Sequence, residues 1–394
     1  MASASLPLLL VALFLGSFGK ILAQISSVRY QAAGSCSIST EQLRVLPTDY
    51  ERDVLQAFTT TTAGTGLAAA AQELQNCLFQ SYDPAFDVLI GNNRTLYQVG
   101  PTRSYNWAHE GTAYLPDSNE VLFFSDAKNP GQANRVSLDT GNVVPVPLES
   151  PIGAATGATN YEGEILVATF GDYENGIPAG ILQLDVYNGT WKWVLNNWFG
   201  LHFNGPNDIV ALNDGSFIFT DSQFGVTQGF SPGGAQPAVY LVPPTGPARV
   251  IINQLPTTIN GLALSADQQT LYVSTVQANN SDPADAVPLD MSNSIYAGNL
   301  VPFGGGRFAQ NSRVFAVSDH GYADGFKLDV NGNVFASSGD GVDVFGANGS
   351  LLGKIIIPAS QSSQQTVNNL VFAGSKLVIG HNTDVLMLQL NTTG

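Results

Sequence analysis

The chain has 394 residues, of which 44% are hydrophobic and 12% are charged, so it can bury a large core. Its formal net charge of -16 and its pI of about 4.4 argue against nucleic acid or an anionic membrane as a partner, because both would repel it. An acidic surface also serves solubility, so the charge alone assigns no function. Length alone favours two domains, yet a β-propeller of this length can be one domain.

The N-terminus has the pattern of a secretory signal peptide. Residues 6–18 are almost wholly apolar, but a bilayer span needs ~20 residues. Ala23 offers a cleavage point, so we expect residues 1–23 to be removed. No later stretch is long and apolar enough for a transmembrane helix. Five Asn-x-Ser/Thr acceptors fit a secreted glycoprotein: Asn93, Asn188, Asn279, Asn348 and Asn391.

Residues 24–82 are predicted to form an N-terminal extension that is partly helical. Helical patterns cover residues 40–43, 50–58 and 66–79. The chain has two cysteines, Cys36 and Cys77, and an even count in an oxidising compartment favours one disulfide. We therefore expect this bond to staple the extension.

The rest of the chain has a β pattern with six repeats. Each repeat begins at a polar position, continues with alternating apolar residues, turns about seven residues on, and ends in a β-rich run. The repeats start 44 to 64 residues apart, which fits four-stranded propeller blades and not a β-sandwich. We predict an all-β, six-bladed β-propeller over residues 83–394. The repeats are residues 110–126, 156–169, 207–221, 260–274, 324–338 and 368–381.

Two further segments complete the predicted ring. Residues 86–90 are mostly apolar and precede the first repeat, so we expect them to form a strand of the last blade, paired with residues 385–388. Residues 277–291 are rich in Asn, Asp and Pro, and an insertion there explains the longest spacing between repeats.

The polar positions that open the six repeats should lie at one height around the central axis. All six side chains carry oxygen, and none is a thiolate or an imidazole, which suits Ca²⁺ better than Zn²⁺. Two of them are carboxylates that would repel each other without an ion. A polar channel filled with water remains the alternative. The six positions are Glu110, Thr156, Asn207, Asn260, Asp324 and Asn368.

Three of the four histidines flank these positions. His109 neighbours Glu110, while His202 and His320 come shortly before the third and fifth repeats, so a bound substrate could reach them. Adjacent strand residues point to opposite faces, so a place in the blade core stays open for His109. A structural role is equally open for each of these histidines and for His381.

Four short motifs carry a family resemblance. They resemble the signature blocks of the senescence-marker-protein/gluconolactonase/regucalcin family, and the similarity is greatest to secreted fungal lactonases that act on aldonolactones and pantolactone. The resemblance covers residues 80–390. The motifs are Glu110-Gly111, Asn207-Asp208, Asn260-Gly261-Leu262 and Asp324-Gly325.

This resemblance implies roles for individual residues. Glu110, Asn207, Asn260 and Asp324 would bind one catalytic divalent cation, expected to be Ca²⁺, while Thr156 matches no ligand of the family. The chain departs from mammalian members at residue 205, where a glycine replaces an arginine that grips the substrate.

The expected function is that of a secreted, calcium-dependent lactonase. The metal would polarise the lactone carbonyl, and Asp324 would act as general base, with His202 or His320 sharing that task. Two other classes remain open. A condensing propeller similar to strictosidine synthase would depend on a glutamate instead of a metal, and intact ligand residues count against it. The second open class is a propeller that binds glycans or proteins without catalysis. The sequence does not indicate the oligomeric state.

Overall fold

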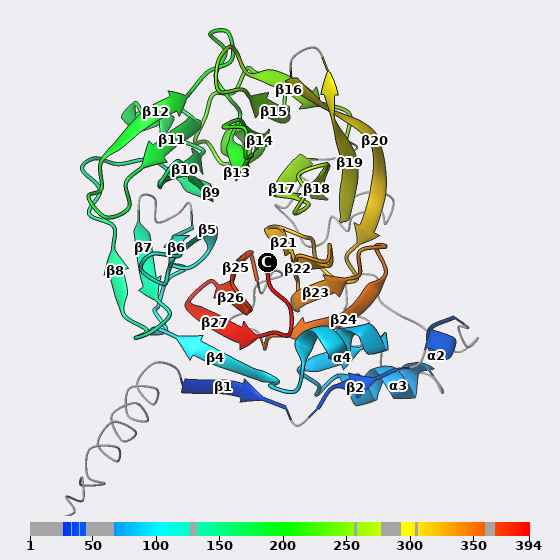
Figure 1. Cartoon of the computed structure of the whole chain (residues 1–394). Helices are drawn as coiled ribbons and strands as arrows, with labels where there is room; N and C mark the ends of the chain where they lie inside the picture. Colours follow the sequence, from blue (N-terminus) through cyan, green and yellow to red (C-terminus); the bar gives the residue numbers. More distant parts are fainter. Residues whose placement is uncertain are drawn as a thin grey trace, which may run out of the picture.

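The computed structural model describes residues 27–32, 34–38, 40–44, 67–126, 132–255, 258–276, 293–303, 306–358 and 367–394. In this part of the chain, six β-sheets stand as blades around a central axis (Figure 1). The predicted six-bladed β-propeller is therefore confirmed. The predicted signal peptide, the predicted helix at residues 50–58 and the insertion at 277–291 lie outside the described residues.

Blades 1 to 4 have four strands each, and chain order runs from the axis outward. Blade 1 contains β5 (Glu110–Leu115), β6 (Glu120–Phe124), β7 (Ala133–Ser137) and β8 (Val143–Pro145). Blade 2 contains β9 (Ala155–Tyr161), β10 (Glu164–Thr169), β11 (Gly180–Leu184) and β12 (Trp191–Leu195). Blade 3 contains β13 (Pro206–Ala211), β14 (Phe217–Asp221), β15 (Ala238–Val242) and β16 (Arg249–Ile252). Blade 4 contains β17 (Thr258–Leu264), β18 (Thr270–Val276), β19 (Ser294–Phe303) and β20 (Gly306–Val317).

The last two blades are widened by the N-terminal extension. Blade 5 contains β21 (Phe326–Leu328), β22 (Val334–Ser338), β23 (Gly341–Phe345) and β24 (Leu351–Ile356), followed outward by β3 (Phe79–Ser81) and β2 (Cys36–Ser37). Blade 6 contains β25 (Asn369–Ala373), β26 (Lys376–His381) and β27 (Asp384–Gln389), followed by β4 (Thr95–Val99) and β1 (Ser27–Gln31). Figure 1 shows β1 lying outside β4.

The helices are short. In the extension, α2 and α3 confirm two of the three predicted helical segments, and within the described residues no helix is long and apolar enough to cross a membrane. The helical elements are α2 (Thr40–Arg44), α3 (Leu67–Leu74), α4 (Pro84–Ile90), the 3-10 helix η2 (Tyr173–Asn175) and α5 (Phe224–Thr227).

The prediction that residues 86–90 form a strand was wrong, because they belong to helix α4. Asp83 caps this helix by accepting a hydrogen bond from the Ala85 N–H at 2.8 Å, and Pro84 occupies its first turn. Phe86 and Ile90, four residues apart, are both buried. The ring is closed at β27 as predicted, but β4 supplies the closing strand, with Leu96 to Val99 paired with Leu388 to Val385.

The apolar core lies between neighbouring blades. One cluster joins Leu122 of blade 1 to Val167 of blade 2, and another joins Leu166 of blade 2 to Phe219 of blade 3. Each blade therefore depends on both of its neighbours, as expected for a closed propeller.

The extension is fastened by the predicted disulfide between Cys36 and Cys77, which is present with a Cα–Cα distance of 6.0 Å. Cys36 opens β2, and Cys77 precedes β3 by two residues. The bond therefore joins the chain just before β3 to the strand that pairs with it in parallel.

The double substitution Cys36→Ser with Cys77→Ser tests the staple. The bond closes a separation of 41 residues, so its loss should reduce the stability of the extension by about 2–4 kcal/mol. Limited proteolysis should cleave the variant faster before residue 83, with the blades still resistant. Equal cleavage rates in variant and wild type would contradict this expectation.

Candidate active site

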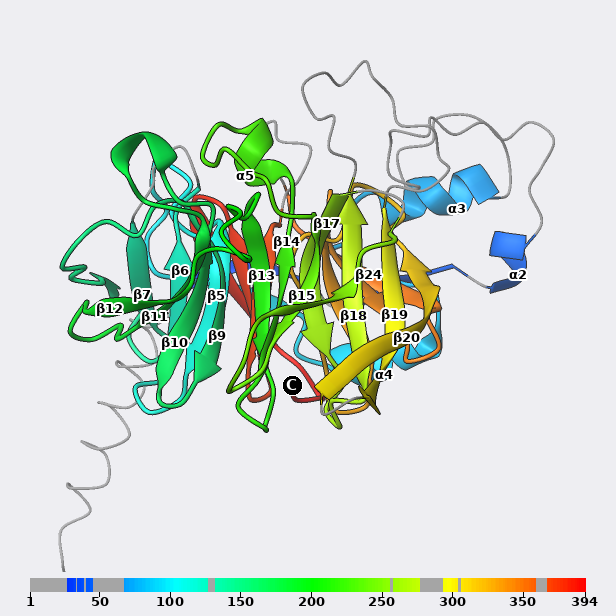
Figure 2. The same cartoon turned by 90° about the horizontal axis from the view of Figure 1, so that it is seen from above.

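The residues predicted to form a ring lie at one end of the innermost strands. Glu110 opens β5, and the other polar positions stand at or just before the first residues of the corresponding strands. Helix α5 stands at the same end of the propeller (Figure 2). The structure therefore brings the predicted ring together at one mouth of the central axis.

A β-bulge lies at the polar position in each of blades 1 to 4. In blade 1, Glu110 pairs with Phe124 but Ala113 pairs with Leu122, so β5 holds one extra residue. One extra residue likewise follows Pro206 in β13 and Ile259 in β17, and in β9 the extra residue is Thr156. A bulge redirects a side chain and interrupts pairing. This local geometry explains how poor β-formers stand where strands begin.

Glycines next to the ring let neighbouring blades approach closely. A Cβ atom on Gly157 would lie 2.5 Å from the backbone oxygen of Asn207 in the next blade. A Cβ on Gly261 would collide with the backbone oxygen of Asp324. Both positions therefore exclude a side chain.

Hydroxyl groups tie each blade to the next at the ring. Thr156 Oγ1 donates to the backbone oxygen of Pro206 at 2.8 Å, and Thr220 Oγ1 donates to that of Asn260 at 2.7 Å. Ser274 Oγ donates to the backbone oxygen of Asp324 at 3.4 Å. The hydroxyl of Thr156 is thus used between blades, in agreement with its lack of a ligand role in the resemblance.

Two carboxyl groups of the ring are buried close enough to influence each other. Burial raises the pKa of Glu110 well above its ordinary value, and the negative charges of Asp324, Asp208 and Asp126 raise it further. Burial also raises the pKa of Asp324 to about 7, although a hydrogen bond from the Asn260 side chain opposes this rise. The protein alone therefore favours the neutral form of both acids.

Unpaired amide oxygens complete the ring. Oδ1 of Asn260 and Oδ1 of Asn368 are buried, and no hydrogen-bond partner is present for either. Two repelling carboxyl groups beside orphaned amide oxygens form the hard-oxygen set that a divalent cation of the Ca²⁺ type prefers. No cluster of three or more His, Cys, Asp or Glu side chains suited to a metal occurs among the described residues, so a cation here needs the amides as ligands.

The histidines have different surroundings. His109 is turned toward the ring, since its Nε2 lies 3.6 Å from Glu110 Oε1 and 2.8 Å from Asn368 Nδ2. His202 packs edge-on against Tyr173, with ring centroids 5.4 Å apart. His381 is buried with Asp384 at 2.7 Å, which gives it a structural role.

His320 lies on the segment that leads to Asp324, and its backbone oxygen accepts a hydrogen bond from the Gly339 N–H at 3.0 Å. His202 and His320 are therefore both at the mouth where the ring lies, since each belongs to a connection entering an innermost strand. His109 is a further candidate residue of the site, because its side chain contacts Glu110 directly.

Comparison with known proteins decides the family. The sequence model described as "SMP-30/Gluconolactonase/LRE-like region" matches residues 108–378, well over half of the chain and the whole ring. The chain belongs to this family. Lactonohydrolase oryL of Aspergillus oryzae is 28% identical over 289 residues, covering 68% of this chain and 64% of oryL. The gluconolactonase of Zymomonas mobilis is 27% identical over 365 residues, covering 86% of this chain and 95% of that protein.

Solved structures of the SMP-30/gluconolactonase family share the fold. A gluconolactonase of Xanthomonas campestris superposes with a TM-score of 0.63 at 26% identity, covering 79% of this chain and 94% of that one. Regucalcin of Agrobacterium tumefaciens, a calcium-binding protein, gives a TM-score of 0.53 at 15% identity, covering 75% and 97%. At that lower identity the likeness supports the fold alone.

Sequence reasoning passed over Tyr322 and the charge of Asp208. Burial and the charges of Asp324 and Glu110 raise the pKa of Tyr322, which places its hydroxyl near both acids. Asp208 accepts hydrogen bonds from the Leu262 N–H of the next blade and from the Ile209 N–H, at 2.9 and 2.8 Å. The position of Tyr322, two residues before a predicted ligand, was the available signal.

Gly205 lies under helix α5. A Cβ atom at Gly205 would stand 2.6 Å from the backbone nitrogen of Gly225 and 2.9 Å from the ring of Phe170. Asp221 fixes this segment, because its carboxylate accepts hydrogen bonds from the Gly205 N–H at 2.8 Å and from the Asn204 side chain at 2.7 Å. No arginine fits at position 205 in this structure.

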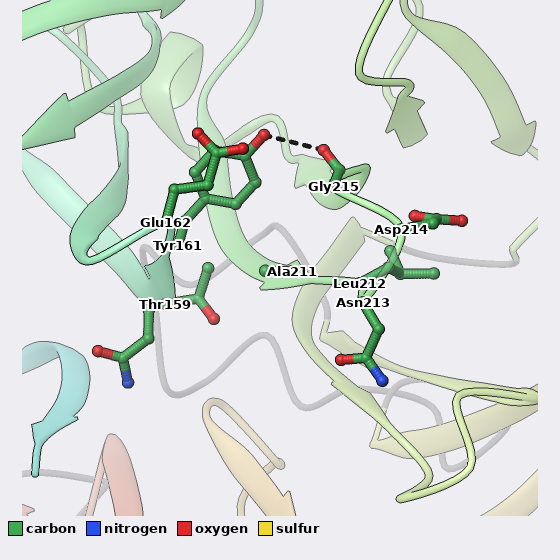
Figure 3. Close-up of a pocket in the computed structure, with 9 residues that line it drawn as sticks. Thr159, Tyr161, Glu162, Ala211, Leu212, Asn213, Asp214 and Gly215 are labelled. Carbon is green, nitrogen blue, oxygen red and sulfur yellow. Dashed lines mark hydrogen bonds between the residues drawn. The ribbon is translucent and has the colours of Figure 1, made fainter.

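A second hollow lies at the opposite end of blades 2 and 3 (Figure 3). It has a volume of about 550 Å³ and is lined by the turns after β9 and β13. Tyr161 donates a hydrogen bond across it to the backbone oxygen of Gly215 at 2.8 Å. It contains none of the predicted ligands, because those stand at the other ends of the same strands.

Replacing Gly261 with alanine should disturb the ring. The added Cβ would push against the Asp324 backbone, so we expect the variant to lose about 1–3 kcal/mol of stability and to bind divalent cations more weakly. Thermal unfolding and a cation titration measure both effects.

The matched control is Gly298→Ala in β19 of the same blade. There the nearest atom to an added Cβ is Ser312 Oγ at 3.4 Å, an ordinary contact. Equal effects of the two substitutions on cation binding would contradict the assigned role of the close approach at Gly261.

Proposed function

We propose that this chain is a secreted, calcium-dependent lactonase. The proposal is carried by the buried pair of Glu110 and Asp324 beside the unpaired Asn260 oxygen, at the mouth of a propeller of this family. The relatives support the reaction class, since they include a lactonohydrolase and a gluconolactonase. The family region covers all the residues that the proposal uses.

Glu110, Asn207, Asn260 and Asp324 would hold the cation. Their two carboxylates match the charge of one divalent ion, and ion binding would favour the ionised state that burial opposes. When bound, the ion would act as a Lewis acid toward the lactone carbonyl.

The remaining chemistry is a proton transfer. A water molecule adds its oxygen to the acyl carbon, the ring C–O bond breaks, and the ring oxygen leaves as a hydroxyl group after gaining a proton. Asp324 is the proposed base that takes the proton of the water and then gives it to the leaving ring oxygen. His202 and His320, which stand at the same mouth, could share this transfer.

The choice of lactone is proposed to differ from that of mammalian family members. Position 205 is closed by Gly225 and Phe170, so the substrate cannot be gripped there by an arginine. The rings of Tyr173 and His202 contact each other in the connections at the mouth of the propeller. We propose that these two side chains take part in selecting the lactone instead.

Secretion is part of the proposal and is supported by the sequence and the disulfide. Disulfides persist in oxidising compartments, and Cys36 is bonded to Cys77. Four of the five predicted glycosylation acceptors lie in described residues, and all four are exposed: Asn93, Asn188, Asn348 and Asn391.

The direct test is hydrolysis of a lactone panel with and without chelator. Purified protein should open at least one sugar, aliphatic or aromatic lactone, lose this activity after dialysis against chelator, and regain it with Ca²⁺. Full activity in metal-free protein would refute the calcium dependence. A bound ion with no hydrolysis of any lactone would instead favour a binding propeller.

Asp324→Asn separates a ligand and base from a channel lining. The change keeps the size of the side chain but removes one of two negative charges at the proposed ion. We expect weaker calcium binding and a loss of hydrolysis by a factor of at least ~10², the scale for losing a general base. Steady-state kinetics at saturating calcium, with circular dichroism as a check of the fold, measure the outcome.

Asp214→Asn is the control, because Asp214 lies in the turn at the opposite end of blade 3. Its carboxylate accepts a hydrogen bond from the Ser216 N–H and pairs with Arg307 Nε at 3.3 Å. Hydrolysis should be unchanged in this variant. If Asp324→Asn were as active as wild type, the site assignment would fail even with the propeller intact.

A further inference from the structure

A buried lysine in blade 5 stands among three aspartates. The Lys354 ammonium lies 2.8 Å from Asp340, 3.2 Å from Asp319 and 3.3 Å from Asp343, and its side chain is only 1% exposed. The Asp343 side chain is fully buried. We call Lys354 and these three aspartates the Lys354 cluster.

The Lys354 cluster reaches the segment that carries proposed active-site residues. Asp319 belongs to residues 318–325, which connect β20 to β21 and contain His320, Tyr322 and Asp324. The hydrogen bond from Lys354 Nζ to Asp319 Oδ2, at 3.2 Å, joins this segment to β24.

Three other hydrogen bonds hold the same segment against blade 5. The backbone oxygen of His320 accepts from the Gly339 N–H at 3.0 Å, one residue before Asp340. The Asp324 N–H donates to Ser337 Oγ at 2.8 Å, and the Ser337 N–H donates to the Gly325 backbone oxygen at 3.1 Å. Of these four ties, the one through Asp319 is an ion pair, and it lies nearest the start of the segment.

The N-terminal extension covers this cluster. Lys354 pairs across the strands with Gln80 of β3, which makes β24 an inner strand instead of the blade's edge. Tyr82 follows β3 and lies close enough that the Lys354 and aspartate charges act on its hydroxyl, which donates to Gln80 Oε1 at 2.8 Å. Figure 1 shows the extension along the outer side of blade 5.

We propose that Lys354 is a positioning residue: buried by extension strand β3, it anchors Asp319 and so holds residues 318–325 with Asp324 in its place at the ring. The inference rests on the proposed function for its effect on turnover. A buried ammonium orders carboxylates strongly because little water competes for it. The extension thereby acts on catalysis from outside the propeller.

Two aspartates of the same cluster provide a matched test. Asp319→Ala removes the tie to the active-site segment, whereas Asp340→Ala removes an aspartate of the same charge that lies outside residues 318–325. Both relieve the excess of negative charge around one lysine. We expect kcat to fall about 10- to 100-fold in Asp319→Ala with little change in KM, the scale for a small misplacement of reacting groups. Asp340→Ala should keep most of its turnover.

Hydrogen exchange gives a readout that does not depend on lactone hydrolysis. The Asp324 and Gly325 amides are hydrogen-bonded, to Ser337 Oγ and to the Asn368 backbone oxygen at 2.7 Å. They should exchange at least about 10-fold faster in Asp319→Ala than in Asp340→Ala. Similar exchange and similar kcat in the two variants would overturn the inference. A wild type without activity on any lactone would count against the proposed function, and the exchange result would still decide the positioning.

Asp319→Asn guards against a variant that does not fold. It keeps the shape of the side chain and removes only its charge. If Asp319→Ala melts below the assay temperature, Asp319→Asn must show lower turnover and faster exchange than Asp340→Ala.

Lys354→Arg, which keeps the charge, should retain more turnover than Lys354→Met. Equal turnover in these two lysine variants would also count against an anchoring ion pair.

The role of the extension is tested by proline in its strands. Gln80→Pro interrupts β3 beside Lys354, and Tyr30→Pro interrupts β1, which borders blade 6 instead. Only Gln80→Pro should reduce kcat and speed the exchange of residues 318–325. Equal kcat in the two proline variants would refute a role of β3 in the anchoring.

Discussion

Hydrogen bonds from hydroxyl side chains to backbone oxygens of the next blade fix the ring on which the proposed site depends. Thr220 and Ser274 each cross to the polar position of the following blade, and Thr156 crosses to Pro206, one residue before that position. Buried bonds of this kind are strong where little water competes. The positions of the proposed ligands are thus set by the backbone, through the β-bulges and the close approach of neighbouring blades. The identity of each side chain at these positions is then left to function.

The ring concentrates like charges at that fixed place. Burial raises the pKa of both Glu110 and Asp324, the charge of Asp324 raises that of Glu110 further, and the charge of Asp208 raises both. A fold selected only for stability would place apolar or amide side chains there, because a buried carboxylate needs a partner. The conflict between local stability and the residues present is typical of functional sites, and the proposed cation would resolve it.

The repeats were predictable because the same local event recurs in each blade. A polar residue that breaks an alternating pattern is visible in a sequence, and six copies fix the blade count and the ring. Residues 86–90 form a short apolar run, which periodicity alone cannot assign to a strand or a helix. Asp83 and Pro84 start a helix there, so the capping residues were the signal that identifies this element. The strands of the extension are two to five residues long and gave no periodic signal. The aspartates of the Lys354 cluster stand 35, 14 and 11 residues before Lys354, and no local sequence pattern predicts that these four side chains meet.

The closed position at Gly205 limits which side chains can reach a substrate at the ring. The inner strands set the height and chemistry of the proposed ligands, and all of these residues lie within the matched family region. Helix α5 fills the space above Gly205, and Gly225 makes the contact that leaves no room for a side chain. In the proposed function, recognition of the rest of the substrate would come from connections between strands, such as the two that bring Tyr173 and His202 into contact. Connections of this kind can change without disturbing the bulges that place the ring, so the reaction and the choice of substrate are physically separable in this fold.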